Sequence, residues 1–346
     1  MLLLTQMITA FCAIRTVNLK QVANAITGKA KADSNYRKLQ RFFALTELCY
    51  NELARYIVRL FFNETTDWYL TMDRTNWQYG RANINILVLG ICYKGRAIPI
   101  LWTLLNKKGN SNTQERIELL SRFLNLYGHK RIKALLADRE FIGQDGFTWL
   151  NKQQIPFNIR LKKNECTTNS RGLSVYIDGL FYHLRANERA TLQGQRLLWG
   201  EQVYLSGLRL TDGELLLLAT SHIEEEPIDI YSKRWEIETL FECLKGRGFN
   251  FEDTRLTELE RVNKMVAVLA LSYCWAHKAG EWRSEQGDGL KYKKHGRLEK
   301  SLFRHGLDLL QQIMLGTFTE RHTIRRCINL LKPRDVSPPD IPLVVF

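Results

Sequence analysis

The hydrophobic period of the chain changes near Asp67, and this change constrains the fold most. Before it, apolar residues recur at helical spacing up to about residue 62. After it come three apolar segments of strand length, at 68–72, 84–92 and 97–104. A helical pattern that starts at Asn112, with Glu115 three residues on, leads to one more short strand, 132–137. This order predicts an α/β sheet in which an antiparallel meander leads into a parallel strand.

The charge balance points to a polyanionic partner. The 346 residues include 50 Lys and Arg against 36 Asp and Glu, a formal net charge of +14. A folded surface this basic attracts polyanions, of which nucleic acid is the commonest. A basic protein with no such partner is the alternative.

Cysteine usage and hydropathy indicate a cytoplasmic protein that does not enter membranes. The seven cysteines are scattered without a C-x-x-C pair, which favours reduced thiols over disulfides or zinc. The longest apolar run, Met265 to Leu271, falls far short of the ~20 residues that span a bilayer. The first residues lack the basic region and cleavage site of a signal peptide.

Basic residues gather in two helical regions. In the N-terminal region, Asn18 starts one helix, and the next helix carries Arg37, Lys38 and Arg41. This pair is either a DNA reader that resembles a helix-turn-helix or an amphipathic pair with a solvated basic face. Near the C-terminus, residues 291–306 include Lys293, Lys294 and Arg297, which either contact the DNA backbone or lie on a solvated helix face.

The segment 164–228 is predicted to be a β-rich insertion. Asp178-Gly179 and Asp212-Gly213 each separate two short strand-like segments, and such dipeptides are strong hairpin signals. After Pro227 the pattern becomes helical to about Lys245, and a second long helix is expected over roughly 259–282.

Two aspartates stand where strands are expected to end. Asp73 follows 68–72 and Asp138 follows 132–137, and the carboxyl edge of an open sheet is where functional groups gather. Two carboxylates on neighbouring strands repel each other unless a cation lies between them. Ligands with oxygen only suit Mg²⁺ or Mn²⁺. Taken singly, each acid is also a common turn or cap residue.

A stripe of polar residues marks the helix after Pro227. At about 100° per residue, Tyr231, Arg234, Glu238 and Lys245 fall within a sector of roughly 60°. Glu238 is placed to join the two aspartates, while a guanidinium and an ammonium on one line suit a run of phosphates. Ordinary pairing of charges on a helix surface is the alternative.

These four residues reproduce a family signature. Their spacing resembles the Y-(2)-R-(3)-E-(6)-K motif of bacterial cut-and-paste insertion-sequence transposases, the IS-four-like group. The segments 71–75, 137–141 and 248–254 are also similar to that family. The resemblance implies an α/β fold with an RNase H-like mixed sheet flanked by helices, a β-rich insertion and an N-terminal helical domain.

The resemblance also implies an activity: DNA transposition by two-metal phosphodiester hydrolysis and strand transfer at terminal inverted repeats. Asp73, Asp138 and Glu238 would be the catalytic metal ligands, and Asp73 would bridge two Mg²⁺ or Mn²⁺ ions. Tyr231, Arg234 and Lys245 would contact DNA phosphates. In related enzymes a tryptophan of the insertion stacks on a flipped base; here Trp199 is the candidate, and a buried core tryptophan is the alternative.

The family implies a homodimer that pairs two element ends and acts on target DNA, in the bacterial cytoplasm at the nucleoid. Two other functions remain open: a junction resolvase of the same fold, and a DNA-binding regulator that no longer cuts. The expected organisation follows the patterns above: a helical DNA-binding domain at 1–62, a catalytic core at 63–163 and 229–285, the insertion at 164–228 and a basic region at 286–346.

Overall fold

The computed structural model describes residues 2–287, 294, 299–318 and 320–333. It divides into two compact units. One unit comprises residues 67–241, and the other combines the chain up to Thr66 with the chain from Glu242 onward. The catalytic core and insertion expected from the sequence lie largely in the first unit.

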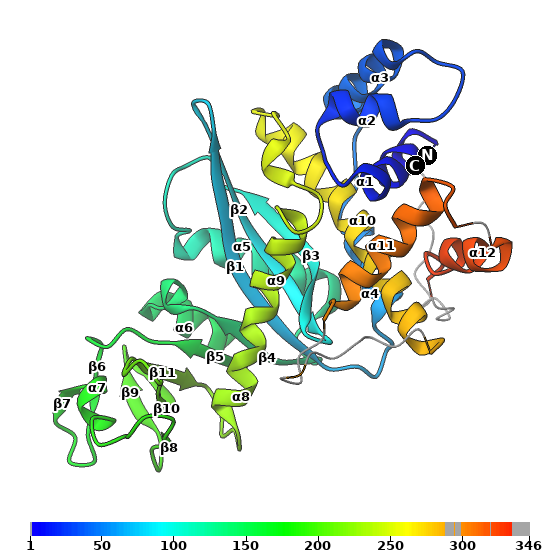
Figure 1. The fold of residues 1–346 in the computed structure, drawn as a ribbon. Helices are drawn as coiled ribbons and strands as arrows, with labels where there is room; N and C mark the ends of the chain where they lie inside the picture. The colour runs from blue at the N-terminus through cyan, green and yellow to red at the C-terminus, as the bar shows by residue number, and fades with distance from the viewer. Residues whose placement is uncertain (1, 288–293, 295–298, 319, 334–346) are drawn as a thin grey trace. The chain divides into compact units, whose positions relative to one another are not determined.

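The unit 67–241 is built on one sheet (Figure 1). Its first five strands are β1 (Trp68–Tyr79), β2 (Ala82–Tyr93), β3 (Arg96–Leu104), β4 (Ile132–Ala137) and β5 (Phe157–Arg160). They lie in the order β3-β2-β1-β4-β5. The first three strands form an antiparallel meander, whereas β4 runs parallel to β1 and β5 runs parallel to β4. This order and these directions are those of the RNase H-like fold, which confirms the predicted fold class.

The β-rich insertion extends this sheet. Its strands are β6 (Cys166–Thr168), β7 (Ser174–Tyr176), β8 (Arg189–Thr191), β9 (Arg196–Leu198), β10 (Glu201–Arg209) and β11 (Leu215–Thr220). β11 pairs with β5, β10 pairs with β11, and both β8 and β9 pair with β10, so that nine strands join in one sheet. β6 and β7 form a separate pair.

One of the two predicted hairpins in the insertion is wrong. Asp212-Gly213 does connect β10 to β11, and Gly213 has the positive φ of such a turn. Asp178-Gly179 instead lies inside a helical turn, α7 (Ile177–Leu180). Ile177 and Phe181 are both fully buried, and residues four apart lie on the same side of a helical turn.

Helices cover both faces of the sheet (Figure 1). On β1, Met72 lines a small cavity with residues of α5 (Thr113–Tyr127) and α6 (Gln144–Lys152). The preceding residue, Thr71, donates a hydrogen bond to the Arg234 carbonyl in the segment that follows α8 (Pro227–Ser232). Successive strand residues point to opposite faces, so α5 and α6 lie on one face and the Arg234 segment on the other. α5 begins with the capping box that the sequence predicts, Asn112 with Glu115.

The other unit is helical in its described residues. It contains α1 (Leu2–Ile14), α2 (Leu19–Ala25), α3 (Ala32–Leu45), α4 (Tyr50–Phe61), α10 (Leu259–Glu285), α11 (Leu302–Met314) and α12 (Arg321–Asn329), with a short 3₁₀ turn, η3 (Phe251–Asp253). α10 and α11 cross at Gly280 and Gly306, where a Cβ on either glycine would meet the other helix's backbone within 2 Å. Among the described residues no single helix is long and apolar enough to cross a bilayer. Only α1 and α2 taken together have that length and apolar character, and the two helices are bent by 99° relative to each other.

Candidate active site

Asp73 lies inside a strand, which corrects the prediction that a strand ends there. β1 continues to Tyr79 because it pairs with β2 from Leu70 to Tyr79, with Asp73 opposite Val88. The parallel pairing with β4, however, ends at Met72 and Ala137. Asp73 and Asp138 are therefore the residues that directly follow the last pair of this parallel ladder. The two acids lie next to each other at the carboxyl end of β4. They do so because the parallel pairing of β1 with β4 ends there, and not because both strands end.

Glu238 reaches the same region from a helix. The segment after β11 comprises α8, a 3₁₀ turn η2 (Lys233–Trp235) and α9 (Glu236–Leu244). The Arg234 guanidinium donates to Asp73 Oδ2 at 3.3 Å and to Glu238 Oε1 at 2.6 Å. Asp73 and Glu238 thus share one cation. Asp138 lies on the other side, with its Oδ1 at 4.0 Å from a guanidinium nitrogen of Arg160.

The break in the helix changes the predicted polar stripe. Because η2 interrupts the α-helix and α9 ends at Leu244, the four signature residues do not share one continuous helix. Tyr231 is 3% exposed and packs against Leu218 and Ile228. Lys245 belongs to the other unit, where it forms an ion pair with Glu252 at 2.9 Å.

Burial controls the electrostatics of this site. Burial raises the pKa of Asp73 to about 6, against the lowering effects of the Arg74 backbone N–H and of Arg234. The charges of Glu140 and Glu238 raise it further. Burial likewise raises the pKa of the Tyr231 hydroxyl, which therefore stays protonated. Burial therefore disfavours the charged form of Asp73, and a cation bound next to the carboxylate would offset this cost.

The residues fit a divalent metal in their chemistry. All three acids offer oxygen ligands, the type that Mg²⁺ and Mn²⁺ prefer. Asp138 Oδ1 is buried and accepts no hydrogen bond within the described part of the chain, so it retains capacity for a ligand. The described residues contain no preformed cluster of three metal-ligating side chains. Arg234 instead lies between Asp73 and Glu238, where a cation would bind.

Comparison with known proteins identifies the chain. A family model for the transposase DDE domain matches residues 64–275, more than half of the sequence. The chain belongs to the DDE transposase family. No curated protein matches it. It is similar to a solved structure described as the piggyBac transposase synaptic complex with hairpin DNA, at 10% identity and a TM-score of 0.48, over 98% of this chain and 77% of that chain.

This membership establishes the activity of the transposase. DNA transposition, through DNA cleavage and strand transfer, is the function of the family, and its members generally use divalent metal ions. The predictions of a DNA partner and of a DDE enzyme are therefore confirmed at the level of the family.

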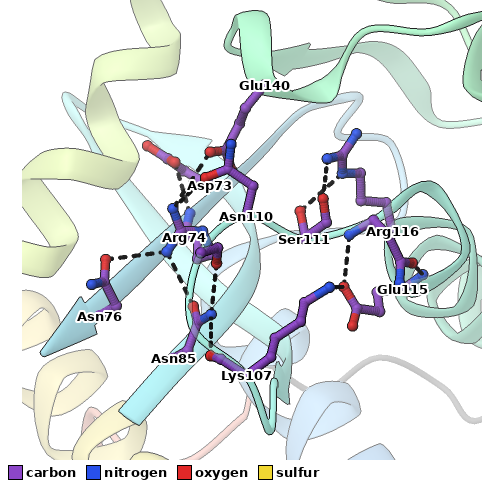
Figure 2. Close-up of polar contacts among 12 residues, drawn as sticks. Asp73, Arg74, Asn76, Asn85, Lys107, Asn110, Ser111, Glu115, Arg116 and Glu140 are labelled. Carbon is purple, nitrogen blue, oxygen red and sulfur yellow. Dashed lines mark hydrogen bonds and ion pairs between the residues drawn. The ribbon is translucent and has the colours of Figure 1, made fainter. Parts of the chain in front are cut away.

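A polar network surrounds the residue that follows Asp73. Figure 2 shows Arg74, the residue after Asp73, among side chains from several segments. Its guanidinium donates to Asn76 at 3.1 Å, to Asn85 at 3.3 Å and to Asn110 at 3.0 Å, and lies 3.6 Å from a Glu140 carboxylate oxygen.

Asn85 connects this network to the backbone of the loop before α5. It is 1% exposed, and its amide donates to the backbone carbonyls of Lys107 and Gly109. Through Arg74 and Glu140, β1 is tied to the short turn η1 (Arg139–Phe141) that follows Asp138. Sequence reasoning missed this network; the signal was Arg74 directly after the first acid and Glu140 two residues after the second.

Two tryptophans of the transposase are candidates for stacking on a base, and they differ in exposure: Trp199 is partly buried, whereas Trp235 is exposed. Trp199 forms the turn between β9 and β10 and packs edge-on against the buried Phe147, with ring centroids 5.2 Å apart. This packing favours the structural role over base stacking. Trp235, which sequence reasoning missed, is 54% exposed, and the Arg234 guanidinium lies 4.7 Å from its ring centre.

The remaining predicted DNA contacts stay predictions, and the structure shows only how exposed some of these residues are. Arg37, Lys38 and Arg41 are exposed on α3, and the two arginines line an open groove with Arg261 of α10. Lys294 is exposed. Lys293 and Arg297 lie outside the described residues.

Proposed function

We propose that this transposase belongs to the insertion-sequence group with the Y-R-E-K signature. It would move its element by cut-and-paste at terminal inverted repeats. One observation carries the assignment of the catalytic acids: Asp73 and Asp138 directly follow the last paired residues of adjacent parallel strands, and Arg234 joins Asp73 to Glu238. Three acids from distant parts of the sequence are thereby presented to one region of the sheet edge.

Each acid has a role in holding divalent cations. Asp73, between the other two, would contact both ions, and Asp138 and Glu238 would each complete one site. When bound, the two ions activate the attacking water or 3′-hydroxyl and stabilise the leaving oxygen. The carboxylates act as ligands, so no protein general base is required.

Arg234 has a role before and after metal binding. Without metal, its guanidinium compensates the charges of Asp73 and Glu238. With a divalent cation held by Asp73 and Glu238, this compensation would no longer be needed, and the guanidinium would be suited to bind a DNA phosphate in bidentate fashion. The roles of Tyr231 and Lys245 in phosphate binding follow from the signature alone.

The transposase is proposed to act as a homodimer on two element ends, in the cytoplasm at the nucleoid. Pairing of ends requires two active sites in one assembly. Its DNA partners would be the terminal inverted repeats of the element and the target DNA, because cut-and-paste transposition acts on both.

Replacing any one of the three acids tests the assignment. Asp73→Ala, Asp138→Ala and Glu238→Ala should each lower Mg²⁺-dependent cleavage of a duplex carrying the element's end by roughly 100-fold or more, because a lost ligand removes a metal contact. DNA binding in a gel-shift assay should remain. The matched control is Asp145→Ala, an exposed acid at the start of α6.

Cleavage by Asp73→Ala at the wild-type rate would contradict the assignment. Joining of the cut 3′ end to a target plasmid would distinguish a transposase from a resolvase, and no cleavage by the wild-type protein would favour a DNA-binding regulator.

A further inference from the structure

An open cleft of about 630 Å³ adjoins the candidate catalytic Asp138. Its lining comes from four segments: the turn after β4, the loop before α5, the turn after β5, and the turn between β10 and β11. The charged and polar residues that line it are Asn110, Asp138, Arg139, Glu140, Lys162, Lys163, Asn164 and Glu214. Neither lysine of this group was singled out from the sequence.

The topology explains why the two lysines face this edge. β4 and β5 are parallel, with Ala137 beside Ile159, so the chain leaves both strands at the same edge of the sheet. Asp138 follows β4 there, and Lys162 and Lys163 follow β5 after the buried Leu161. A turn closed by the Glu165 N–H and the Lys162 carbonyl holds both lysines in exposed positions.

The charges in the cleft are compensated unevenly. Glu214 pairs with Arg160 at 2.8 Å and with Arg139 at 3.8 Å, and Glu140 pairs with Arg74. Lys162 and Lys163, by contrast, have no ion pair with any residue that the structure describes. The cleft therefore presents two ammonium groups without an acidic partner next to an acid that is proposed to hold metal.

We propose that Lys162 and Lys163 form a phosphate-binding site for the DNA strand that passes through the active site. The ligand class is the sugar–phosphate backbone next to the scissile phosphate, because ammonium groups bind phosphate oxygens as point charges and carry no base preference. This inference rests on the proposed function of Asp138. It adds a contact surface that the Y-R-E-K signature does not contain.

The salt dependence of DNA binding tests the proposal. The variants are Lys162→Ala, Lys163→Ala and the double variant, and the control is Lys152→Ala. Lys152 is an exposed lysine of the same unit that precedes β5, at the opposite end of that strand. Its replacement removes the same charge. The probe is a short duplex of random sequence, measured by fluorescence anisotropy over a series of NaCl concentrations.

Each lysine that binds a phosphate contributes about 0.9 to the slope of log affinity against log salt. The double variant should therefore lose about two units of slope, and each single variant about one. The control should keep the wild-type slope. Equal slopes for the wild type and the double variant would overturn the proposal, as would an equal loss in Lys152→Ala.

A second measurement separates this inference from the proposed function. Mn²⁺ binding, followed by electron paramagnetic resonance, should be unchanged in both single variants because neither lysine is a metal ligand. Single-turnover cleavage at moderate salt should fall roughly tenfold in the double variant as DNA contacts are lost. A wild-type protein that neither binds Mn²⁺ nor cleaves DNA would refute the proposed function, whereas intact cleavage with unchanged slopes refutes only the lysine site.

Discussion

At the scale of single residues, charge compensation organises the site. Asp73 is partly buried near Glu140 and Glu238. Two groups stabilise its charge: the Arg234 guanidinium, and the Arg74 backbone N–H, which donates to Asp73 Oδ1 at 2.7 Å. The Arg74 side chain is directed elsewhere, to three asparagines and Glu140 (Figure 2). The Arg74 side chain is therefore engaged within the protein, and we expect it to act as a positioning residue.

We expect Arg74 and Glu140 to act on metal binding as a unit. Arg74→Gln and Glu140→Gln should each lower Mn²⁺ affinity roughly tenfold, the usual effect of losing a supporting residue behind metal ligands. The double variant should be little worse than either single variant, because both remove the same link between β1 and η1. Titration calorimetry of the four proteins measures this coupling. Losses that simply multiply would show that the two residues act independently.

At the scale of elements, hydrogen bonds attach the segment from α8 to α9 to the sheet. The Tyr93 N–H donates to Glu236 Oε2 at 2.7 Å, and the Arg96 guanidinium donates to the Thr239 carbonyl at 3.2 Å. These contacts attach the first turn of α9 to the turn between β2 and β3. Glu238, two residues after Glu236, is positioned as a consequence.

Glu236 should make stability depend on pH. Burial raises the pKa of Glu236 to about 7, more than the Tyr93 N–H and nearby cations lower it. A carboxyl whose pKa is higher in the folded state stabilises the fold at low pH, and this contribution is lost as pH rises from about 4.5 through 7. Glu236→Gln should therefore be more stable than the wild type at pH 8 by about 1–2 kcal/mol, and nearly equal to it at pH 4.5.

Urea denaturation at the two pH values measures this difference. Glu242→Gln is the control, an exposed acid on the same helix that pairs with Arg247. A Glu236→Gln variant that is less stable than the wild type at pH 8 would show that the ionised carboxylate stabilises the fold.

At the scale of the whole molecule, the net charge of +14 should dominate the affinity for DNA. If about six phosphates are neutralised, affinity for a random duplex should fall roughly 10³-fold between 50 and 200 mM salt. Fluorescence anisotropy across that range measures the fall. A nearly flat response would remove the argument from charge, whatever the active site does.

The sequence by itself was enough to predict the order of the strands along the chain, the capping box of α5 and the β-rich insertion. These features depend on local patterns: the period of apolar residues, caps within one turn, and the fourfold spacing of the signature. The motifs predicted a transposase of the Y-R-E-K group; the family match confirms a DDE transposase, and the group itself stays a proposal. The assignment of the three acids as metal ligands stays a prediction.

Only the tertiary structure decided which groups surround those acids. Pairing with β2 carried β1 past Asp73, a helical turn replaced the Asp178-Gly179 hairpin, and packing buried Tyr231 and Arg234. The partners of Arg74 come from strands, a loop and a turn that lie far apart in the chain. Burial and ion pairing depend on such distant segments, so no local pattern in the sequence contains them.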